Sequence, residues 1–270
     1  MGRRASLIEK QIKERIGIEK LNKQGCLMKI VEYVSATDMV VEFQDEYKAR
    51  VHTQWSNFIR KNVKNPYYPS VYNVAITGNK YPTWVSGKNE HTKEYQIWMN
   101  MLIRCYDKKI KERYPTYQDV TCCEEWLFFE NFYEWLHSQE NFDRWYENDG
   151  WHLDKDILIK GNKIYSPNTC CLVPYNVNKL FLKNDADRGD LPVGVNRDTK
   201  GYGYIARCMN PFTGERDYLG YRTSVLSAFQ LYKSYKEDLI KKVAKLEYSK
   251  GNITKQCYDA MMCYEVEITD

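Results

Sequence analysis

Hydrophobic positions recur every three to four residues in two stretches near the middle of the chain. In the first, residues 94–109, the repeat consists of Trp98, Met101, Leu102 and Cys105. In the second, residues 122–139, it consists of Trp126, Phe129, Phe132, Tyr133 and Leu136. This spacing places the apolar side chains on one face of a helix, so both stretches are predicted to be amphipathic helices with a buried stripe.

Alternating patterns predict strands on either side of these helices. Near the N-terminus, "CLMKIVEYV" and "MVVEF" flank the turn "ATD", which is typical of a hairpin. A short helix is expected in "HTQWSNFIRKNVKNP", ended by Asn65-Pro66, and a helical arm in residues 5–14. Near the C-terminus, three strands are expected in "LPVGVNRD", "GYGYIARCMN" and "RDYLGYRT", before a long helix that ends at Gly251.

The order of these elements predicts an α+β protein of three modules. Residues 1–90 form an N-terminal arm and a basic β-rich module, and residues 91–183 a helical module. Residues 191–270 form a three-stranded antiparallel sheet packed on a helix, with C-terminal helices. The polar stretch "LKNDADRGD" links the last two modules. On alternation alone, Ile205 is predicted to face the helix, with Tyr204 and Ala206 facing outward and Arg207 sharing the parity of Ile205 unless a bulge intervenes.

Charge is distributed unevenly along the chain. Residues 48–93 hold eight Lys and Arg and one acid, whereas residues 94–150 hold six basic and twelve acidic residues. The basic block suits a surface that contacts phosphate, with Arg60, Lys61 and Lys64 as candidates, and an ordinary solvated basic face is the alternative. The acids of residues 122–139 face outward in the predicted helix and would repel phosphate.

Cysteine usage and hydropathy limit the class of protein. The nine cysteines form no CxxC pair, so no structural zinc is expected, and their irregular placement favours a reducing compartment. The chain has no apolar run of about 18 residues. We therefore expect a cytoplasmic protein without a membrane partner, in a bacterial host if the chain is phage-encoded.

The stretch 151–179, "WHLDKDILIKGNKIYSPNTCCLVPYNVNK", predicts a β-hairpin followed by a helix. With "W..M..RC" at 98–105 and the aromatic helix 126–136, its "LDKDIL" and "YSPNTC" motifs resemble phage HNH-type homing endonucleases. The resemblance implies a ββα-metal core that uses Mg²⁺ or Mn²⁺ to hydrolyse DNA. Asp154 takes the position of the first metal ligand and Asn178 that of the last.

Two positions of this motif depart from the family pattern. Lys155 stands where the family has the catalytic His, and Thr169 where it has the loop Asn. His152 is an alternative base, because residues 152 and 154 share a face of a strand. A solvated, charged strand without catalytic function is the alternative interpretation of the residues 154–156.

The third module resembles AP2-type DNA-binding domains in "GV" at 194–195, "YIAR" at 204–207, "YLGYRT" at 218–223 and "AFQLYK" at 228–233. The family lays its sheet in the major groove of double-stranded DNA. The resemblance implies DNA contacts from Arg197, Lys200, Tyr204, Arg207, Arg216 and Arg222. Asn196 departs from the family, which has Arg directly after "GV".

Three functions remain open on the sequence. The first is a metal-dependent HNH-type DNA endonuclease. The second is a DNA-binding protein with an inactive HNH-like core that acts as a regulator, or as an inhibitor of host defence through a host protein. The third is a protein-interaction module that uses the acidic helix.

Overall fold

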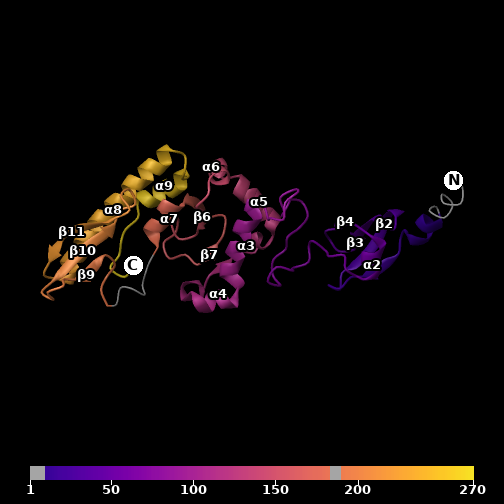
Figure 1. The fold of residues 1–270 in the computed structure, drawn as a ribbon, viewed down its shortest axis with the longest axis horizontal. Coiled ribbons are helices and arrows are strands. Elements are labelled where there is room, and N and C mark those ends of the chain that lie inside the picture. Colours follow the sequence, from indigo (N-terminus) through magenta and orange to yellow (C-terminus); the bar gives the residue numbers. More distant parts are fainter. Residues whose placement is uncertain (1–9, 183–189) are drawn as a thin grey trace. The chain divides into compact units, whose positions relative to one another are not determined.

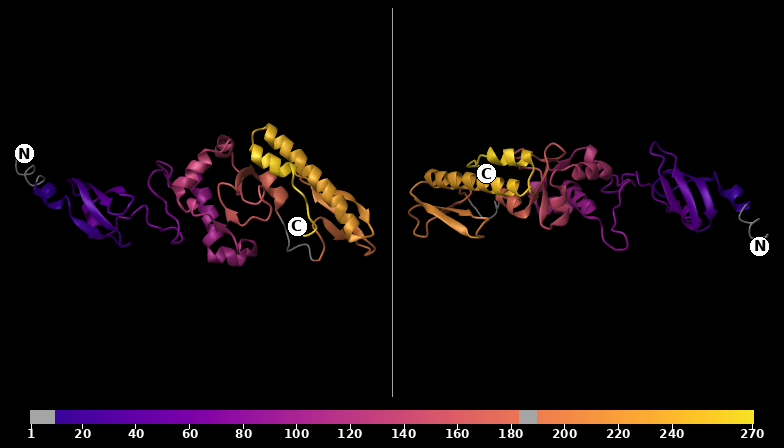
Figure 2. Two further views of the ribbon diagram at one scale, coloured as in Figure 1. Left: turned by 180° about the vertical axis from the view of Figure 1, so that it is seen from behind. Right: turned by 90° about the horizontal axis from the view of Figure 1, so that it is seen from above.

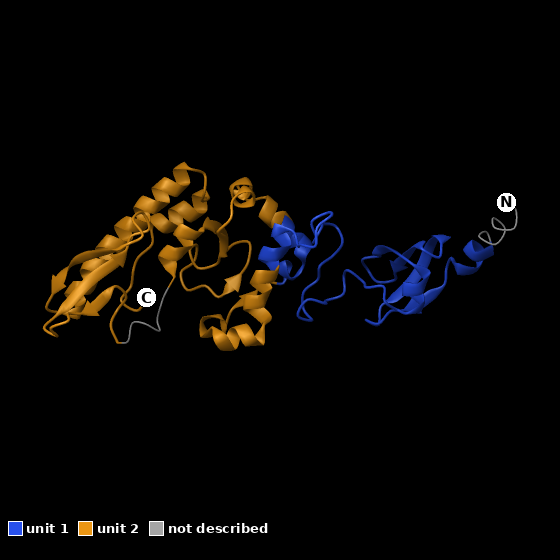
Figure 3. Cartoon of the chain, in the orientation of Figure 1, with its two compact units in different colours: residues 1–98, 124–133 blue, residues 99–123, 134–270 orange. Residues whose placement is uncertain are grey.

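A computed structural model describes residues 10–182 and 190–270 of the chain (Figure 1). Unit 1 comprises residues 1–98 and 124–133, and unit 2 comprises residues 99–123 and 134–270 (Figure 3). Both units combine helices with small sheets, so the predicted α+β class is confirmed. The described part of the predicted arm, residues 10–14, is helical, and residues 5–9 of the arm lie outside the described residues, as does most of the predicted linker 182–190.

Unit 1 begins with a four-stranded antiparallel sheet in the order β1-β2-β3-β4. Its strands are β1 (Glu19–Leu21), β2 (Leu27–Ser35), β3 (Asp38–Phe43) and β4 (Arg50–Thr53). The hairpin β2–β3 and the short helix α2 (Trp55–Ile59) confirm the predictions for this region. Alternate side chains of β2 and β3 are fully buried and pack with Phe58 of α2, so the sheet and helix form one core.

The rest of unit 1 surrounds the aromatic helix. It contains the start of α3 (Lys93–Tyr106), η2 (Glu125–Leu127) and part of α5 (Phe129–His137). Trp98 donates its indole N–H to the carbonyl of Trp126 over 2.8 Å. Glu130 accepts hydrogen bonds from the hydroxyl of Tyr67 (3.0 Å) and from the backbone N–H groups of Asn79 (2.9 Å) and Lys80 (2.8 Å).

Both predicted apolar stripes are buried. Trp98, Met101, Leu102 and Cys105 of α3 are at most 2% exposed, and Trp126, Phe129, Phe132 and Leu136 are fully buried. Tyr133 is the exception, because it is partly exposed and stacks on Tyr81 with ring centroids 3.9 Å apart. The stripes therefore serve as core, as their spacing predicts.

Unit 2 contains the remaining elements. Its helices after α3 are α4 (Lys108–Arg113), η1 (Pro115–Tyr117), α6 (Phe142–Glu147), α7 (Tyr175–Phe181), α8 (Val225–Ser249) and α9 (Lys255–Met262). Its strands are β5 (Thr121–Cys122), β6 (Trp151–Asp154), β7 (Ile164–Tyr165), β8 (Cys171–Pro174), β9 (Val195–Arg197), β10 (Tyr204–Met209) and β11 (Arg216–Arg222).

The strands β9, β10 and β11 form the predicted three-stranded antiparallel sheet, in the order β11-β10-β9. Helix α8 runs along one face of this sheet (Figures 1 and 2). Its Ser224 N-cap accepts the N–H of Ser227, and Gly251, with φ of +72°, follows its last turn. Phe229 and Tyr232 are buried in the core that this helix shares with the sheet.

The predicted orientation of β10 is wrong. Ala206 is fully buried toward α8 and Tyr204 packs against the same core, whereas Ile205 is only partly buried and Arg207 is exposed. The helix lies so close that a Cβ on Gly194 would come within 2.0 Å of the Tyr232 ring. Tyr204, Ala206 and Cys208 therefore face the helix, and Ile205 lies on the outer face with Arg207.

One hydrophobic core joins the two halves of unit 2. Val177 and Leu180 of α7 belong to the same buried cluster as Leu239, Ile240 and Val243 of α8. A polar joint reinforces the contact, because Asn141 donates from its amide to the carbonyls of Leu172 and Asn252, both at 3.0 Å. The β6–β8 hairpin, α7 and the three-stranded sheet are thus held in a fixed relation.

Glu247 of α8 is a buried carboxylate at this joint. It is 3% exposed and accepts hydrogen bonds from the amides of Asn176 (3.1 Å) and Asn252 (2.7 Å) and from the ammonium of Lys250 (3.2 Å). Without the Glu247 carboxylate, the amides of Asn176 and Asn252 lose their hydrogen-bond acceptor in a poorly solvated environment. We expect Glu247→Ala to lower the free energy of unfolding by about 3 kcal/mol, measured by chemical denaturation.

The matched control for Glu247→Ala is Lys255→Ala. It breaks the ion pair between Lys255 and Asp259, whose side chains are 58% and 55% exposed. Such pairs contribute less than about 1 kcal/mol. Equal effects of the two substitutions would show that Glu247 does not stabilise the joint.

Candidate nuclease site

The β6–β8 hairpin and α7 form the scaffold of the site. The strands pair antiparallel with Asp154 opposite Cys171, and α7 starts directly after Pro174, whose fixed φ suits a helix start. Leu153, Leu172 and Val173 are buried behind the hairpin. The loop between the strands contains β7, which pairs in parallel with β5. The predicted strand, loop, strand and helix are therefore all present.

A pocket of about 280 Å³ lies at this scaffold. It brings together the four residues predicted for catalysis and metal binding, namely His152, Asp154, Lys155 and Asn178. It also contains basic and aromatic residues from other parts of unit 2, among them Arg104, Tyr117, Lys160, Lys163, Tyr165 and Tyr264. The pocket therefore combines carboxylate, amide and imidazole groups with several cations.

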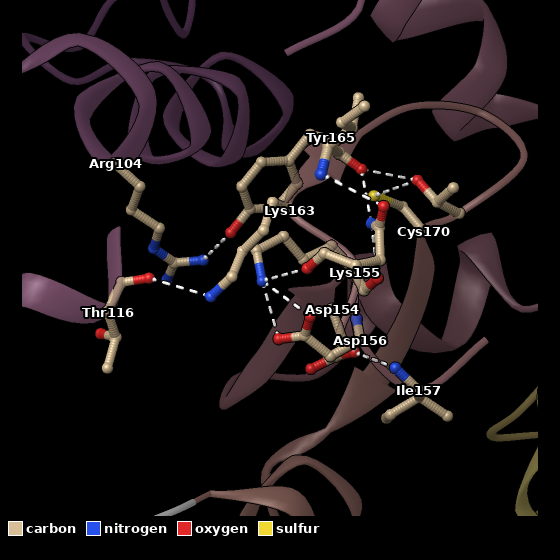
Figure 4. A network of polar contacts seen from close by, with 12 residues as sticks. Arg104, Thr116, Asp154, Lys155, Asp156, Ile157, Lys163, Tyr165 and Cys170 are labelled. Carbon is tan, nitrogen blue, oxygen red and sulfur yellow. Dashed lines mark hydrogen bonds and ion pairs between the residues drawn. The ribbon is translucent and has the colours of Figure 1, made fainter. Parts of the chain in front are cut away.

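Asp154 is held by the turn that follows it. Its Oδ1 accepts the backbone N–H groups of Asp156 (2.7 Å) and Ile157 (2.8 Å) (Figure 4). Burial raises the pKa of the Asp154 carboxyl, and the two N–H groups act in the opposite direction. One oxygen thus fixes the orientation of a carboxylate whose charge is poorly solvated.

Lys155 is engaged within the loop. It is 7% exposed, and its ammonium donates to both carboxylate oxygens of Asp156 at 2.8 and 2.7 Å and to the carbonyl of Asn162 at 3.1 Å (Figure 4). Thr169 also serves the loop, because its hydroxyl donates to the carbonyl of Ile164 over 2.7 Å. Both residues at the departing positions therefore hold the loop together.

His152 shares a strand face with Asp154, and both line the pocket, as parity predicts. Burial, followed by the nearby Arg104 guanidinium, lowers the pKa of His152. Its ring centroid lies 5.9 Å from that of Tyr175. The imidazole is half-buried, and it lines the same pocket as Asp154 from the same strand.

Arg104 is the main site residue that sequence reasoning missed. It comes from the last turn of α3 and donates to the hydroxyl of Tyr165 over 3.1 Å (Figure 4). The "RC" of the helix motif was the available signal. Lys163 donates to the carbonyl of Thr116 (3.5 Å), whereas Lys160 is paired with Asp270 (2.8 Å). Arg104 and Lys163 therefore provide the less neutralised positive charge in the pocket.

The sheet β9–β11 separates the predicted DNA contacts into two groups. Arg207 and Arg216 are exposed on the face away from α8, beside Tyr218 and Tyr221. A bulge between Ala206 and Arg207 lets β11 place Leu219 and Gly220 on the helix side. The outer face is thus basic and aromatic.

The second group lies at the end of the sheet. Arg197 of β9 and Arg222 of β11 lie opposite Tyr204 of β10 in the strand register. The Arg197 guanidinium lies 5.6 Å from the centre of the Tyr204 ring. The predicted outward orientation of Tyr204 is wrong, because its ring packs against the core. Lys200 is exposed in the turn before β10.

Comparisons with known protein families, curated proteins and solved structures found no match to this chain. Within the described ranges, no helix is long and apolar enough to cross a membrane. Nor do three or more His, Cys, Asp or Glu side chains of residues 10–182 and 190–270 gather in a preformed metal cluster. None of the nine cysteines, all of which lie in the described ranges, forms a disulfide bond.

Proposed function

We propose that this chain is a DNA-binding protein of the HNH endonuclease type that hydrolyses phosphodiester bonds with a divalent cation. The observation that carries the proposal is that one pocket is lined by His152 and Asp154 of β6, by Asn178 of α7 and by Arg104. An acid, an amide, an imidazole and a guanidinium are the groups that phosphodiester hydrolysis uses.

The donor set fits a hard cation such as Mg²⁺ or Mn²⁺. The Asp154 carboxylate and the Asn178 amide oxygen would hold it, and such ions commonly complete their coordination with substrate phosphate and water. A cation here would also offset the buried charge of Asp154. Bound, it stabilises negative charge on the phosphate and on the leaving oxygen.

His152 is the residue that we assign as general base. It lies in the pocket on the strand face of Asp154, where it can take a proton from water. Lys155 is unsuited, because its ammonium is directed to Asp156 and Asn162. Lys155 is a positioning residue that keeps the loop closed. Arg104 would bind a phosphate oxygen of the substrate.

The outer face of the β9–β11 sheet supports DNA as the substrate. Arg207 and Arg216 can bind phosphate or guanine, and Tyr218, 62% exposed, offers an aromatic surface beside them. This sheet and the pocket share one hydrophobic core. A duplex held by the sheet would therefore meet the pocket at a defined distance along its backbone.

A plasmid assay tests the proposal. We expect supercoiled plasmid to be converted to open-circular or linear DNA in Mg²⁺ or Mn²⁺, and to remain supercoiled in EDTA, because removing the cation removes the charge stabilisation at the phosphate. Plasmid that is bound but uncut in both metals would favour the DNA-binding regulator. No retention of DNA at low salt would favour the protein-interaction module.

A further inference from the structure

A second basic cavity lies in unit 1, next to the four-stranded sheet. Its volume is about 310 Å³, and it is lined by Lys23, Gln24, Lys61, Asn62, Val63 and Lys64. Three of the six residues are lysines and none is acidic. A concave surface with one sign of charge concentrates the field and favours an anion.

The two segments that form this cavity are tied together. Buried Asn22 accepts the N–H groups of Gln24 (2.9 Å) and Cys26 (2.8 Å) and donates to the carbonyl of Val63 (3.0 Å). Lys23 donates its backbone N–H to the carbonyl of Lys61 over 3.1 Å. The backbones that carry the lysines are therefore fixed before any ligand arrives, which lowers the entropy cost of binding.

Lys61 occupies a backbone position that favours glycine. It follows the C-cap of α2 with φ of +61°, and its N–H donates to the carbonyl of Phe58 over 3.1 Å. Helices commonly end in this left-handed conformation at glycine, and a lysine there strains the backbone. Residues held in such conformations concentrate at binding sites. Lys61 lines the cavity, and a role in binding gives a reason for a lysine at this position.

Among the described residues, no ion pair neutralises the lysines of the cavity. Asp45 accepts a hydrogen bond from the amide of Asn65, which follows Lys64, while Glu42 pairs with Arg50 at 3.0 Å and Glu19 with Lys29 at 3.3 Å. Across the residues that the structure describes, no carboxylate lies within ion-pair distance of the three cavity lysines, which are all exposed. Their ammonium groups are available to an external anion.

We propose that Lys23, Lys61 and Lys64 form a phosphate-binding site in unit 1. It takes the phosphate group of a nucleic-acid backbone. The role of this site in DNA binding rests on the proposed function above, whereas its affinity for phosphate follows from the cavity alone. Because lysine acts as a point charge without a base-reading geometry, the site contributes affinity without sequence preference.

The test compares Lys61→Gly with Lys48→Gly in the full chain. Lys48 also has a positive φ, of 49°, and is exposed in the same module, but it does not line the cavity. Both substitutions remove one charge and one strained side chain, so neither should lower the melting temperature. On a 20-base-pair duplex of arbitrary sequence, we expect Lys61→Gly to weaken binding about fivefold and to reduce the salt slope by about one, with Lys48→Gly unchanged.

If the two variants and the wild type bind the duplex with equal affinity, the cavity has no role in DNA binding. The nuclease proposal is unaffected by that result. If the wild type retains no duplex at low salt, the proposed function itself fails. In that case, titration of inorganic phosphate into the ¹⁵N-labelled chain, followed by NMR, tests whether the cavity binds phosphate. Shifts of the amides of residues 23 and 61–64 that are lost in Lys61→Gly would support it, and their absence in the wild type would refute it.

Discussion

Asp154→Asn is expected to reduce plasmid nicking in Mg²⁺ or Mn²⁺ by about 100-fold or more. The asparagine retains an oxygen that can accept the N–H groups of Asp156 and Ile157, so the turn after β6 should survive. What it loses is the negative charge that would hold the cation. The rate of nicking, the affinity for duplex DNA and the thermal unfolding of the variant are measured side by side, and only the first should change strongly.

Asp156→Asn is the matched control for this prediction. It makes the same carboxylate-to-amide change in the same pocket, but Asp156 is committed to the ammonium of Lys155 and its side chain is 46% exposed. We expect a loss of nicking of less than about tenfold. Nicking by Asp154→Asn at the wild-type rate, or equal losses in both variants, would remove Asp154 from the role of metal ligand.

Much of the fold was predictable because its signals are local. The stripe from Trp98 to Cys105 has a helical period, and every member of it is buried. The strands around Gly201 and Gly214, both with φ of +75°, were found because glycine supplies the turns. Such elements depend on a few neighbouring residues, and so the sequence specifies them directly.

The faces of β10 were not predictable from alternation. The pattern favoured burying Ile205, the larger apolar residue, but the space is set by α8, whose Phe229 and Tyr232 fill it. Tyr204, Ala206 and Cys208 pack toward this helix, and Ile205 does not. Which face of β10 is buried depends on α8, which begins about 20 residues later in the chain. The local sequence pattern of the strand therefore does not specify it.

The pocket was predictable only in part, for a similar reason. His152, Asp154 and Asn178 follow from one continuous motif of strand, loop and helix. Arg104 meets Tyr165 across 61 positions, and Lys160 meets Asp270 across 110. These contacts depend on tertiary packing. The resemblance supplied the motif, and the structure supplied the cations and aromatic rings around it.

The double charge reversal Arg207→Glu with Arg216→Glu is expected to weaken binding to duplex DNA by about 100-fold and to lower the salt slope by about two. Both side chains are exposed on the sheet face away from α8, so the substitutions leave the core intact and place negative charge where phosphate is proposed to lie. Fluorescence anisotropy over a series of salt concentrations measures both quantities.

The pair Arg197→Glu with Arg222→Glu separates a specific face from general electrostatics. It changes the net charge equally, but these arginines flank Tyr204 at the end of the sheet, on the parity of the helix side. If the outer face is the DNA surface, this pair should cost clearly less affinity, about tenfold or below. Equal losses of affinity would mean that DNA binding depends only on the total charge, and an unchanged affinity in both pairs would exclude the sheet as a DNA-binding surface.

The same variants link binding to nicking, since the sheet and the pocket share a core. A loss of affinity confined to the outer-face pair should reduce nicking in proportion to binding, without a change in the nicking rate at saturating DNA.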